Sequence, residues 1–125
     1  MSEKHKQIVN EINNAFTNND SETFLNYCSD DVTWTMIGEK SNKGKNAIRE
    51  WLASMGDFEP PKFTVDKLIA DDTSVVCFGD MSMKDKSGTE GKYSFCDVYE
   101  FKGDVIVDLR SFVVKLKDAG KAAAN

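Results

Sequence analysis

The spacing of apolar residues in the first part of the chain predicts helices. One face of a helix over residues 3–18 is formed by Ile8, Val9, Ile12, Ala15 and Phe16. These positions recur at the period of about 3.6 residues that is typical of an amphipathic helix. Two asparagines end the pattern, and Asp20 belongs to the residue types that cap helices. A short second helix that carries Phe24 and Leu25 is therefore expected.

A brief strand and a third helix follow. Residues Val32 to Ile37 alternate in hydrophobicity, which predicts a strand, and the polar stretch after Gly38 predicts a loop. After Gly44, one helical face is shared by Ala47, Ile48, Trp51, Leu52 and Met55. The pair of prolines at 60 and 61 prevents any continuation of this helix.

From Lys62 onward the helical period gives way to alternation. Four alternating runs cover about 62–70, 74–84, 91–102 and 104–115. Short turn sequences join them, so neighbouring strands must be antiparallel and form a meander. We therefore predict a single α+β domain over residues 1–125, with three N-terminal helices on one face of a mainly antiparallel sheet. Residues 117–125 are expected to form a solvated tail.

The predicted sheet is strongly curved. Strands of about ten residues exceed the usual five or six, and long sheets coil. Gly79 lies in the middle of the 74–84 run. A residue without a side chain at such a place marks a bend or bulge, unless it is merely tolerated there. A curved sheet covered by helices on one side leaves a concave space, and ligands bind in such spaces.

Asp97 departs from the pattern of its strand. Alternation places it on the same face as Tyr93, Phe95, Tyr99 and Phe101, and this aromatic face must point at the core. An unpaired buried carboxylate is unfavourable and burial raises its pKa, a combination that is common at functional sites. Asp97 is thus a candidate catalytic acid or base, with Tyr99 as an assisting hydrogen-bond donor. The alternatives are a structurally satisfied buried aspartate and a bulge that turns the side chain to solvent.

The same alternation predicts the wall of a pocket around Asp97. With the pairing that the turns suggest, Asp97 lies across from the region of Cys77 on one side and Leu109 on the other. The expected pocket residues are Trp34, Met36, Trp51, Met55, Met81, Tyr93, Phe95, Leu109 and Ser111. Methionine and tryptophan give an adaptable apolar wall, although any one of these residues alone is more simply explained as core.

Charge and composition exclude several classes of function. The 16 basic and 21 acidic side chains give a net charge of −5, without the basic stripe that nucleic-acid binding requires. No apolar run approaches the roughly 20 residues of a membrane helix, and no signal-peptide pattern is present. Three separated cysteines suit a reducing compartment, so a cytoplasmic protein is expected. The single histidine, His5, falls in a fraying first helical turn, so we expect no metal, no cofactor and no histidine-based nucleophile.

The order of elements and several short motifs resemble the nuclear-transport-factor-2-like superfamily. The motifs are the Asn-Asn-Asp break at 18–20, Ser29 to Trp34 entering the first strand, Gly44 to Ile48 opening the third helix, and Asp97 to Gly103 before the last strand. Within that superfamily the chain is most similar to the SnoaL-like polyketide cyclases and ketosteroid isomerases. The resemblance covers nearly the whole chain and implies a cone-shaped fold, which hosts enzymes and non-enzymes alike.

Residue by residue, the resemblance retains one part of the isomerase site. Asp97 stands where those enzymes keep a protonated aspartate that donates to the substrate oxygen. Met36 stands in place of their general base, Ile12 in place of their oxyanion tyrosine, and Leu52 in place of a supporting tyrosine. A thioether cannot remove a proton from carbon, so ketosteroid isomerisation by that route is not expected. Asp97 still implies a polar anchor in an apolar pocket.

These observations leave two hypotheses for function and one for assembly. The first function is cofactor-free isomerase, cyclase or hydratase chemistry through Asp97 on a small hydrophobic, carbonyl-bearing molecule. The second is non-catalytic binding of a small hydrophobic molecule, so whether the protein is an enzyme stays open. A homodimer is expected because the outward face of the sheet carries an apolar patch of a kind that monomers rarely expose. That patch consists of Val76, Phe78, Ile106, Phe112 and Val114.

Overall fold

The described part of the chain, residues 2–54, 61–84 and 87–116, forms an α+β fold in the computed structural model. Its helices are α1 (Ser2–Thr17), α2 (Ser21–Asn26) and α3 (Lys45–Ser54). Its strands are β1 (Cys28–Met36), β2 (Lys40–Lys43), β3 (Lys62–Ala70), β4 (Ser74–Lys84), β5 (Glu90–Lys102) and β6 (Val105–Lys115). The tail predicted over 117–125 lies outside the described residues.

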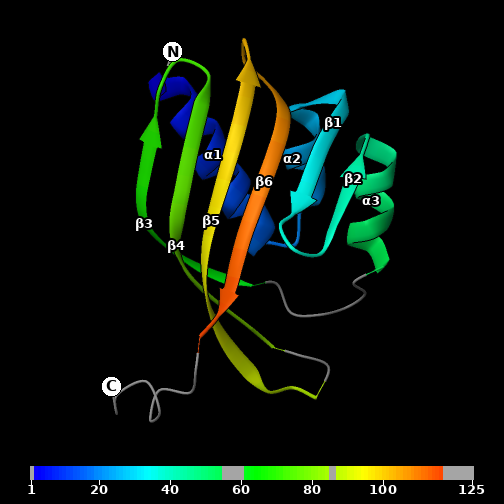
Figure 1. Ribbon diagram of the computed structural model, residues 1–125, viewed down its shortest axis with the longest axis vertical. Helices are drawn as coiled ribbons and strands as arrows, with labels where there is room; N and C mark the ends of the chain where they lie inside the picture. The colour runs from blue at the N-terminus through cyan, green and yellow to red at the C-terminus, as the bar shows by residue number, and fades with distance from the viewer. Residues whose placement is uncertain (1, 55–60, 85–86, 117–125) are drawn as a thin grey trace.

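The strands form one curled sheet in the order β2-β1-β6-β5-β4-β3. Strands β3 to β6 are consecutive antiparallel neighbours, which confirms the predicted meander. Strand β1 joins the meander by parallel pairing with β6, and β2 pairs with β1 at the edge of the sheet. All the helices lie on the same side of the sheet (Figure 1). The predicted α+β architecture is therefore confirmed, and the sheet has an inner face toward the helices and an outer face away from them.

The helices form at the positions that the apolar spacing and the capping residues predicted. In α1, the predicted apolar stripe faces the sheet, and Ile8, Val9 and Ile12 are at most 3% exposed. The carboxylate of Asp20 caps α2 by accepting a hydrogen bond from the Thr23 backbone N–H at 3.3 Å, as expected of an N-cap aspartate. No helix in the described residues is long and apolar enough to cross a membrane.

Two strand predictions near the sheet edge were incomplete. Strand β1 begins at Cys28, four residues earlier than the alternating pattern, and the polar segment expected to be a loop contains β2. The segment Lys40–Lys43 has no hydrophobic residue, and Asn42 is its one buried side chain. Its strand conformation comes from backbone pairing with β1, which requires no apolar side chain. The pattern of hydrophobic residues therefore could not predict β2.

Gly79 marks a bulge, which settles its alternative interpretations. The pairing of β3 with β4 shifts between Val65 and Lys67, so that Asp66 is an extra residue opposite Gly79. A Cβ atom on Gly79 would lie 2.0 Å from the Thr64 carbonyl oxygen, far inside contact distance. The glycine is therefore required by the close approach of the two backbones.

A second bulge, between β5 and β6, overturns two predictions. Glu100 pairs with Asp108 while Phe101 pairs with Ile106, which leaves Val107 as the extra residue. Because a shift of one residue exchanges the two faces of a strand, Ile106 points inward and is 0% exposed. It does not belong to the outer apolar face, where it was predicted.

The register beyond the second bulge also corrects the predicted neighbours of Asp97. Its cross-strand partners are Cys77 on β4 and Ser111 on β6. The partner on β4 was predicted correctly. Leu109, expected on the other side, pairs with Tyr99 instead.

His5 is buried, contrary to its expected place in a fraying turn. Its imidazole is 0% exposed, stacks on Phe101 with ring centroids 4.1 Å apart, and its Nε2 lies 2.8 Å from the Gly103 carbonyl oxygen. Asp104 lies 3.5 Å from the same nitrogen. The residue therefore joins the start of α1 to the turn between β5 and β6. The spacing of the α1 stripe includes this position, since His5 lies four residues before Val9, but the expectation of a fraying turn outweighed it.

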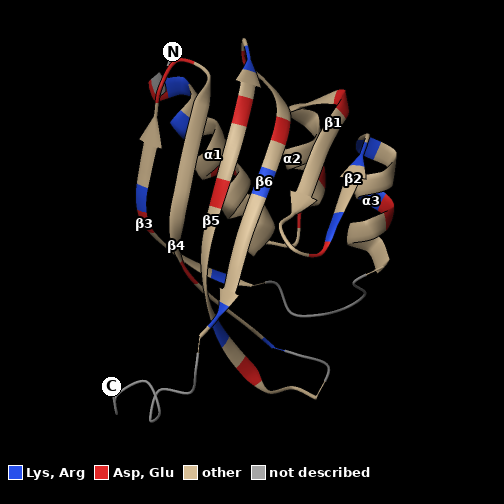
Figure 2. Ribbon diagram, viewed as in Figure 1, with Lys and Arg blue, Asp and Glu red and all other residues tan. Residues whose placement is uncertain are grey.

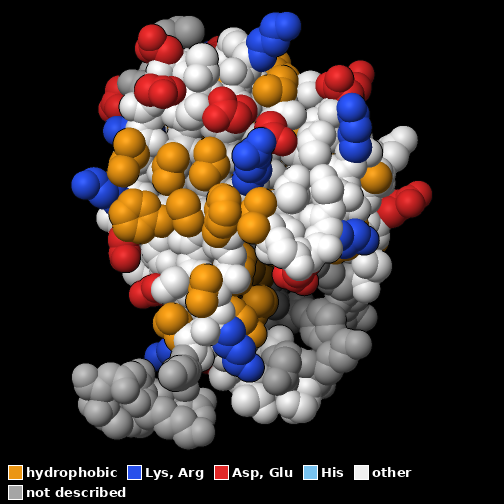
Figure 3. Space-filling model, viewed as in Figure 1, with side chains coloured by type: hydrophobic (Ala, Val, Ile, Leu, Met, Phe, Trp, Pro, Cys, Tyr) orange, Lys and Arg blue, Asp and Glu red, His pale blue; other side chains and the backbone are white. Residues whose placement is uncertain are grey.

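Hydrophobic side chains cross the outer face of the sheet in two neighbouring rows (Figure 3). Register places Ile69, Val76 and Val98 in one row and Phe78, Cys96 and Phe112 in the next, with Val114 beside them. We call these seven residues the outer patch. Its edge carries charges of both signs on the strands (Figure 2), namely Lys67, Asp80, Glu100, Asp108 and Arg110.

Candidate functional site

Asp97 lies on the inner face of the sheet, at the middle of β5. Its neighbours across the strands are Ser111 and Cys77, and Met36 pairs with Ser111 from the next strand. Among the described residues on the inner faces of β4, β5 and β6, no other carboxylate is present. The Asp97 residue retains partial exposure, which excludes the predicted alternative in which a bulge turns it fully into solvent.

Each neighbour of Asp97 is itself held by a buried N–H donor. The Trp34 indole Nε1–H donates to Ser111 Oγ at 2.9 Å, and the Asn13 amide donates to Cys77 Sγ at 3.5 Å. Ser111 lies directly across the strands from Asp97, and its hydroxyl lowers the pKa of that carboxyl as a hydrogen-bond donor does. Asp97 therefore lies at the centre of a polar strip that crosses an otherwise apolar surface.

Burial governs the protonation of this strip. It raises the pKa of Asp97 to about 6, against the opposing effect of the hydrogen bond from Ser111, which stabilises the carboxylate. Burial also raises the pKa of the Cys77 thiol to about 11 and the pKa of Tyr99 well above its ordinary value, and the nearby Asp97 charge adds to both shifts. Near neutral pH, Asp97 can therefore exchange a proton while Cys77 and Tyr99 keep theirs.

The structure brings most of the predicted pocket residues to one place. The core cluster on the inner face includes Trp34, Phe95, Tyr99 and Leu109, and Met36, Trp51 and Met81 pack against it. Ser111 lies beside Asp97 and is 3% exposed. Tyr93 pairs with Met81 and Lys115 farther along the hairpin and does not join this cluster. Met55 lies outside the described residues.

Two polar residues near this surface were missed by sequence reasoning. Asn13 lies within the apolar stripe of α1, four residues after Val9, and is 9% exposed. A polar side chain at a core-facing helical position is the signal that could have identified it. Asn42 is also 9% exposed, and its Nδ2 has no hydrogen-bond partner. Asn42 pairs with Trp34 on the inner face, but its position on an unpredicted strand left no comparable signal.

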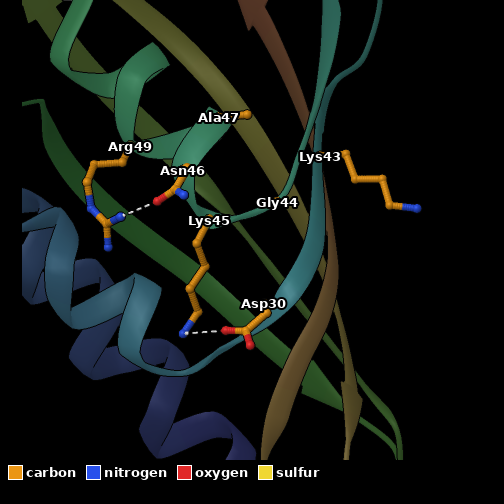
Figure 4. Close-up of a pocket in the computed structure, with 7 residues that line it drawn as sticks. All are labelled: Asp30, Lys43, Gly44, Lys45, Asn46, Ala47 and Arg49. Atoms are coloured by element: carbon orange, nitrogen blue, oxygen red, sulfur yellow. Dashed lines mark hydrogen bonds and ion pairs between the residues drawn. The ribbon is translucent and has the colours of Figure 1, made fainter.

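A separate surface hollow lies where β2 meets α3 (Figure 4). It is lined by Asp30, Lys43, Gly44, Lys45, Asn46, Ala47 and Arg49. Its cations are partly engaged, because Lys45 Nζ lies 3.7 Å from Asp30 and Arg49 forms hydrogen bonds of 2.9 and 3.1 Å with Glu22. In the described residues, no group of three His, Cys, Asp or Glu side chains could hold a metal ion. The inner face around Asp97 remains the stronger candidate site.

Comparison with known proteins identifies the fold family. The family model of the SnoaL-like domain matches residues 9–109. No curated protein matches the sequence. The match includes α2, β1, α3 and the meander through Asp97, so it covers most of the elements that build the inner face.

Solved structures resemble the chain over nearly its whole length. An NTF2-like protein of unknown function from Cytophaga hutchinsonii is 25% identical, with a TM-score of 0.73 over 91% of this chain and 99% of that one. An LEH-like epoxide hydrolase of M. tuberculosis is 18% identical, with a TM-score of 0.78 over 90% and 84% of the two chains. A SnoaL-like polyketide cyclase proposed in Jannaschia sp. CCS1 is 9% identical, with a TM-score of 0.81 over 99% and 92%. These likenesses confirm the fold.

Proposed function

The chain belongs to the SnoaL-like domain family, and from this premise we propose that it binds a small hydrophobic, carbonyl-bearing molecule against the inner face of the sheet and acts on it through Asp97. One observation carries the proposal: Asp97 is a partly exposed residue whose carboxyl lies on an apolar surface and has its pKa raised to about 6 by burial. A buried ionisable group without an opposite charge is unfavourable for folding, so its presence favours a functional role.

Asp97 suits cofactor-free acid–base chemistry. A carboxylate whose pKa lies near the working pH can take a proton from the carbon next to a carbonyl and return it to another atom of the same molecule. Such a step leaves the carboxyl unchanged after each turnover and supports isomerisation, ring closure or addition of water. Tyr99, two residues away on the same face, stays protonated and would act as a hydrogen-bond donor to the developing negative charge.

The structural neighbours support this class of reaction without specifying the substrate. One is named an epoxide hydrolase and another a polyketide cyclase. The first name describes the opening of an epoxide by water, and the second describes ring closure of a polyketide. Epoxides should therefore be tested as ligands of this chain together with ketones and lactones.

The proposal is tested by proton exchange at carbon. Small apolar ketones, lactones and epoxides are incubated with the protein in D₂O, and NMR follows deuterium uptake and product formation. We expect Asp97→Asn to reduce the rate by about 10²–10⁴-fold, the usual contribution of a positioned acid or base. The matched control is Asp80→Asn, which alters an exposed carboxylate on the outer face and should leave the rate unchanged. Equal rates for Asp97→Asn and the unaltered protein would exclude the catalytic role.

Non-catalytic binding is the second candidate, favoured by the absence of a partner base among the described residues around Asp97. In that case calorimetry with the same compounds should show binding with a negative heat-capacity change, because apolar surface is buried. No deuterium uptake or product should accompany it. Asp97→Asn would then weaken the binding of carbonyl ligands without affecting any rate.

We also propose that the outer patch pairs with a second copy of this chain. Ile69, Phe112 and Val114 are 48%, 41% and 62% exposed, which is unusual for neighbouring apolar side chains on a monomer. Positive charges at Lys67 and Arg110 and negative charges at the patch edge allow two identical surfaces to face each other with opposite charges opposed. A nucleic acid would require a positive surface, which this edge does not offer.

The dimer is tested by the mass of the protein in solution. We expect the unaltered chain to sediment as a dimer and Phe112→Glu to raise the dissociation constant by at least about 100-fold, since an unpaired charge would be buried in the contact. The matched control is Val105→Glu, which places the same charge at an exposed apolar site on β6 outside the outer patch. A monomer at every concentration would refute the proposal.

We further propose a cytoplasmic location. Cys28, Cys77 and Cys96 are all free thiols, and reducing compartments preserve such cysteines. Fractionation of cells that express the full chain would test this, and recovery from an oxidising compartment would contradict it.

A further inference from the structure

The indole of Trp34 is rigidly held beside the candidate site. It is 8% exposed and packs between Phe24 and Trp51, with ring centroids 5.2 and 5.1 Å away. These contacts come from α2 and α3, so two helices fix the orientation of one side chain on β1. The Nε1–H bond can therefore serve as a fixed dipole.

The donor capacities of the groups determine the direction of the hydrogen bonds. An indole Nε1–H can only donate, so Ser111 Oγ is the acceptor of the 2.9 Å bond from Trp34. A serine hydroxyl carries one proton, and accepting from Trp34 leaves that proton free to be donated. The Asp97 carboxylate is the cross-strand neighbour that receives it. The three groups thus form a directed chain from indole to hydroxyl to carboxylate.

We propose that Trp34 and Ser111 are positioning residues that act in series on Asp97: the indole N–H orients the serine hydroxyl, and the hydroxyl proton stabilises the carboxylate form. Each donor polarises the next, so the chain is stronger than the last hydrogen bond alone. This inference deepens the proposed function and rests on it for its catalytic consequence. Its physical content, coupling of Trp34 to Asp97 through Ser111, can be measured without any substrate.

The titration of Asp97 can be separated from that of its neighbours. The ionisable groups that interact with its charge are Cys77 on β4 and Cys96 and Tyr99 on β5. All three have raised pKa values, that of Cys77 about 11, so none of them titrates near pH 6. A transition that disappears in Asp97→Asn therefore belongs to Asp97.

The chain contains two tryptophans, which makes the experiment simple to read. In a ¹H–¹⁵N NMR titration, the Trp34 indole signal should shift with a midpoint at about pH 6, the pKa of Asp97. The Trp51 indole, which packs on Trp34 in the same cluster, is the internal reference and should shift much less. The shift of Trp34 should vanish in Ser111→Ala, because the connecting hydroxyl is gone.

Side-chain ¹³C signals of Asp97 supply the second readout. Ser111→Ala should raise the pKa of Asp97 by about one unit, the effect of losing one hydrogen bond to a charged group, whereas Ser111→Thr keeps the hydroxyl and should restore it. Trp34→Phe should raise the pKa of Asp97 by less than Ser111→Ala does. It should cause no further rise in a protein that already carries Ser111→Ala. Ser94→Ala is the matched control, because it removes a 2.9 Å hydroxyl–carboxylate bond to Asp80 on the outer face of the sheet.

The outcomes separate this inference from the proposed function. Equal titration shifts of the two indoles, or an effect of Trp34→Phe that persists in Ser111→Ala, would overturn the coupling whatever the activity. A titrating Trp34 signal together with full activity of Asp97→Asn would instead refute the catalytic role and leave the coupling intact. If the coupling and the catalytic role of Asp97 are both correct, the acidic limb of the rate–pH profile should move to higher pH in Ser111→Ala.

Discussion

The two faces of the sheet depart from the usual distribution of side chains in opposite ways. The inner face, which packs against the helices, carries the carboxylate of Asp97 among buried aromatic and aliphatic residues. The outer face, which no described helix covers, carries the apolar outer patch (Figures 1 and 3). Alternate residues of β5 supply both, since Asp97 points inward and Cys96 and Val98 point outward.

Each departure is unfavourable for an isolated monomer and suggests a different partner. A buried carboxylate destabilises the folded protein unless it is protonated or hydrogen-bonded to a ligand. An exposed apolar patch is unfavourable in water unless another surface covers it. Within one mainly antiparallel sheet, alternation of residues is therefore enough to give the two faces different properties. In the proposals made above, a small molecule occupies the inner face and a second copy of the chain covers the outer face.

The largest expected difference between the faces concerns one pair of phenylalanines. Phe95 points inward at 4% exposure and packs edge-on against Phe63, whereas Phe112 points outward at 41% exposure. We expect Phe95→Ala to lower the free energy of unfolding by about 3–5 kcal/mol and Phe112→Ala by less than about 1 kcal/mol. Chemical denaturation at low protein concentration measures both. Similar losses for the two variants would contradict the assignment of the faces.

A smaller effect is expected from the pH dependence of stability. Because the folded-state pKa of Asp97 is raised from 3.8 to about 6, folding favours its protonated form, and this contribution to stability is lost as pH rises through about 6. Asp97→Asn cannot ionise, so it should be more stable than the unaltered protein at pH 8, by at most about 3 kcal/mol.

The difference should shrink toward pH 4, where the aspartate is neutral in the folded protein. Thermal denaturation across this range measures it, with Asp80→Asn as the control for an exposed carboxylate. A constant difference between pH 4 and pH 8 would show that ionisation of Asp97 does not oppose folding.

The smallest effect concerns thiol reactivity. Cys28 and Cys77 are at most 5% exposed, and burial raises the pKa values of their thiols to about 12 and about 11. Cys96 lies in the outer patch and is partly exposed. We expect an aromatic disulfide reagent to modify one thiol of the native chain and all three after denaturation, because only thiolates react.

The same reaction also reports on the outer face. Modification of Cys96 should slow as protein concentration rises, because a second copy would cover the patch. In Phe112→Glu the rate should not depend on concentration. Rapid reaction of Cys77 in the native protein would instead indicate that the inner face opens readily.

The strands of the meander were predictable because two signals agreed there. The alternating runs at 62–70 and 74–84 coincide with β3 and β4, since a pair of prolines precedes the first run and short polar turns follow each of them. Strand β2 was not predictable, because Lys40–Lys43 has no hydrophobic residue and is held by backbone pairing. The contact of His5 with Gly103 was equally unpredictable, since it depends on how the chain returns to the start of α1.

The candidate site was predictable in its centre and not in its surroundings. Asp97 was identifiable because a charge among aromatic residues breaks a local alternation, and the raised pKa confirms the predicted direction of its shift. The neighbouring residues that influence the pKa of Asp97 could not be identified from the sequence. Trp34 and Ser111 lie 77 residues apart, and neither has a local pattern that indicates a hydrogen bond between them.

Local sequence determined the helices, the long strands and the face to which Asp97 belongs, because periodicity and turn chemistry act over a few residues. The tertiary structure alone decided what lies beside it. The extra residue Val107 in β6 shifts the pairing by one position, and without that shift Asp97 would face Arg110 instead of Ser111. Hydrophobic pattern could not reveal the shift, because Val105, Ile106 and Val107 are all β-branched apolar residues and nothing in their order says which one is the extra residue.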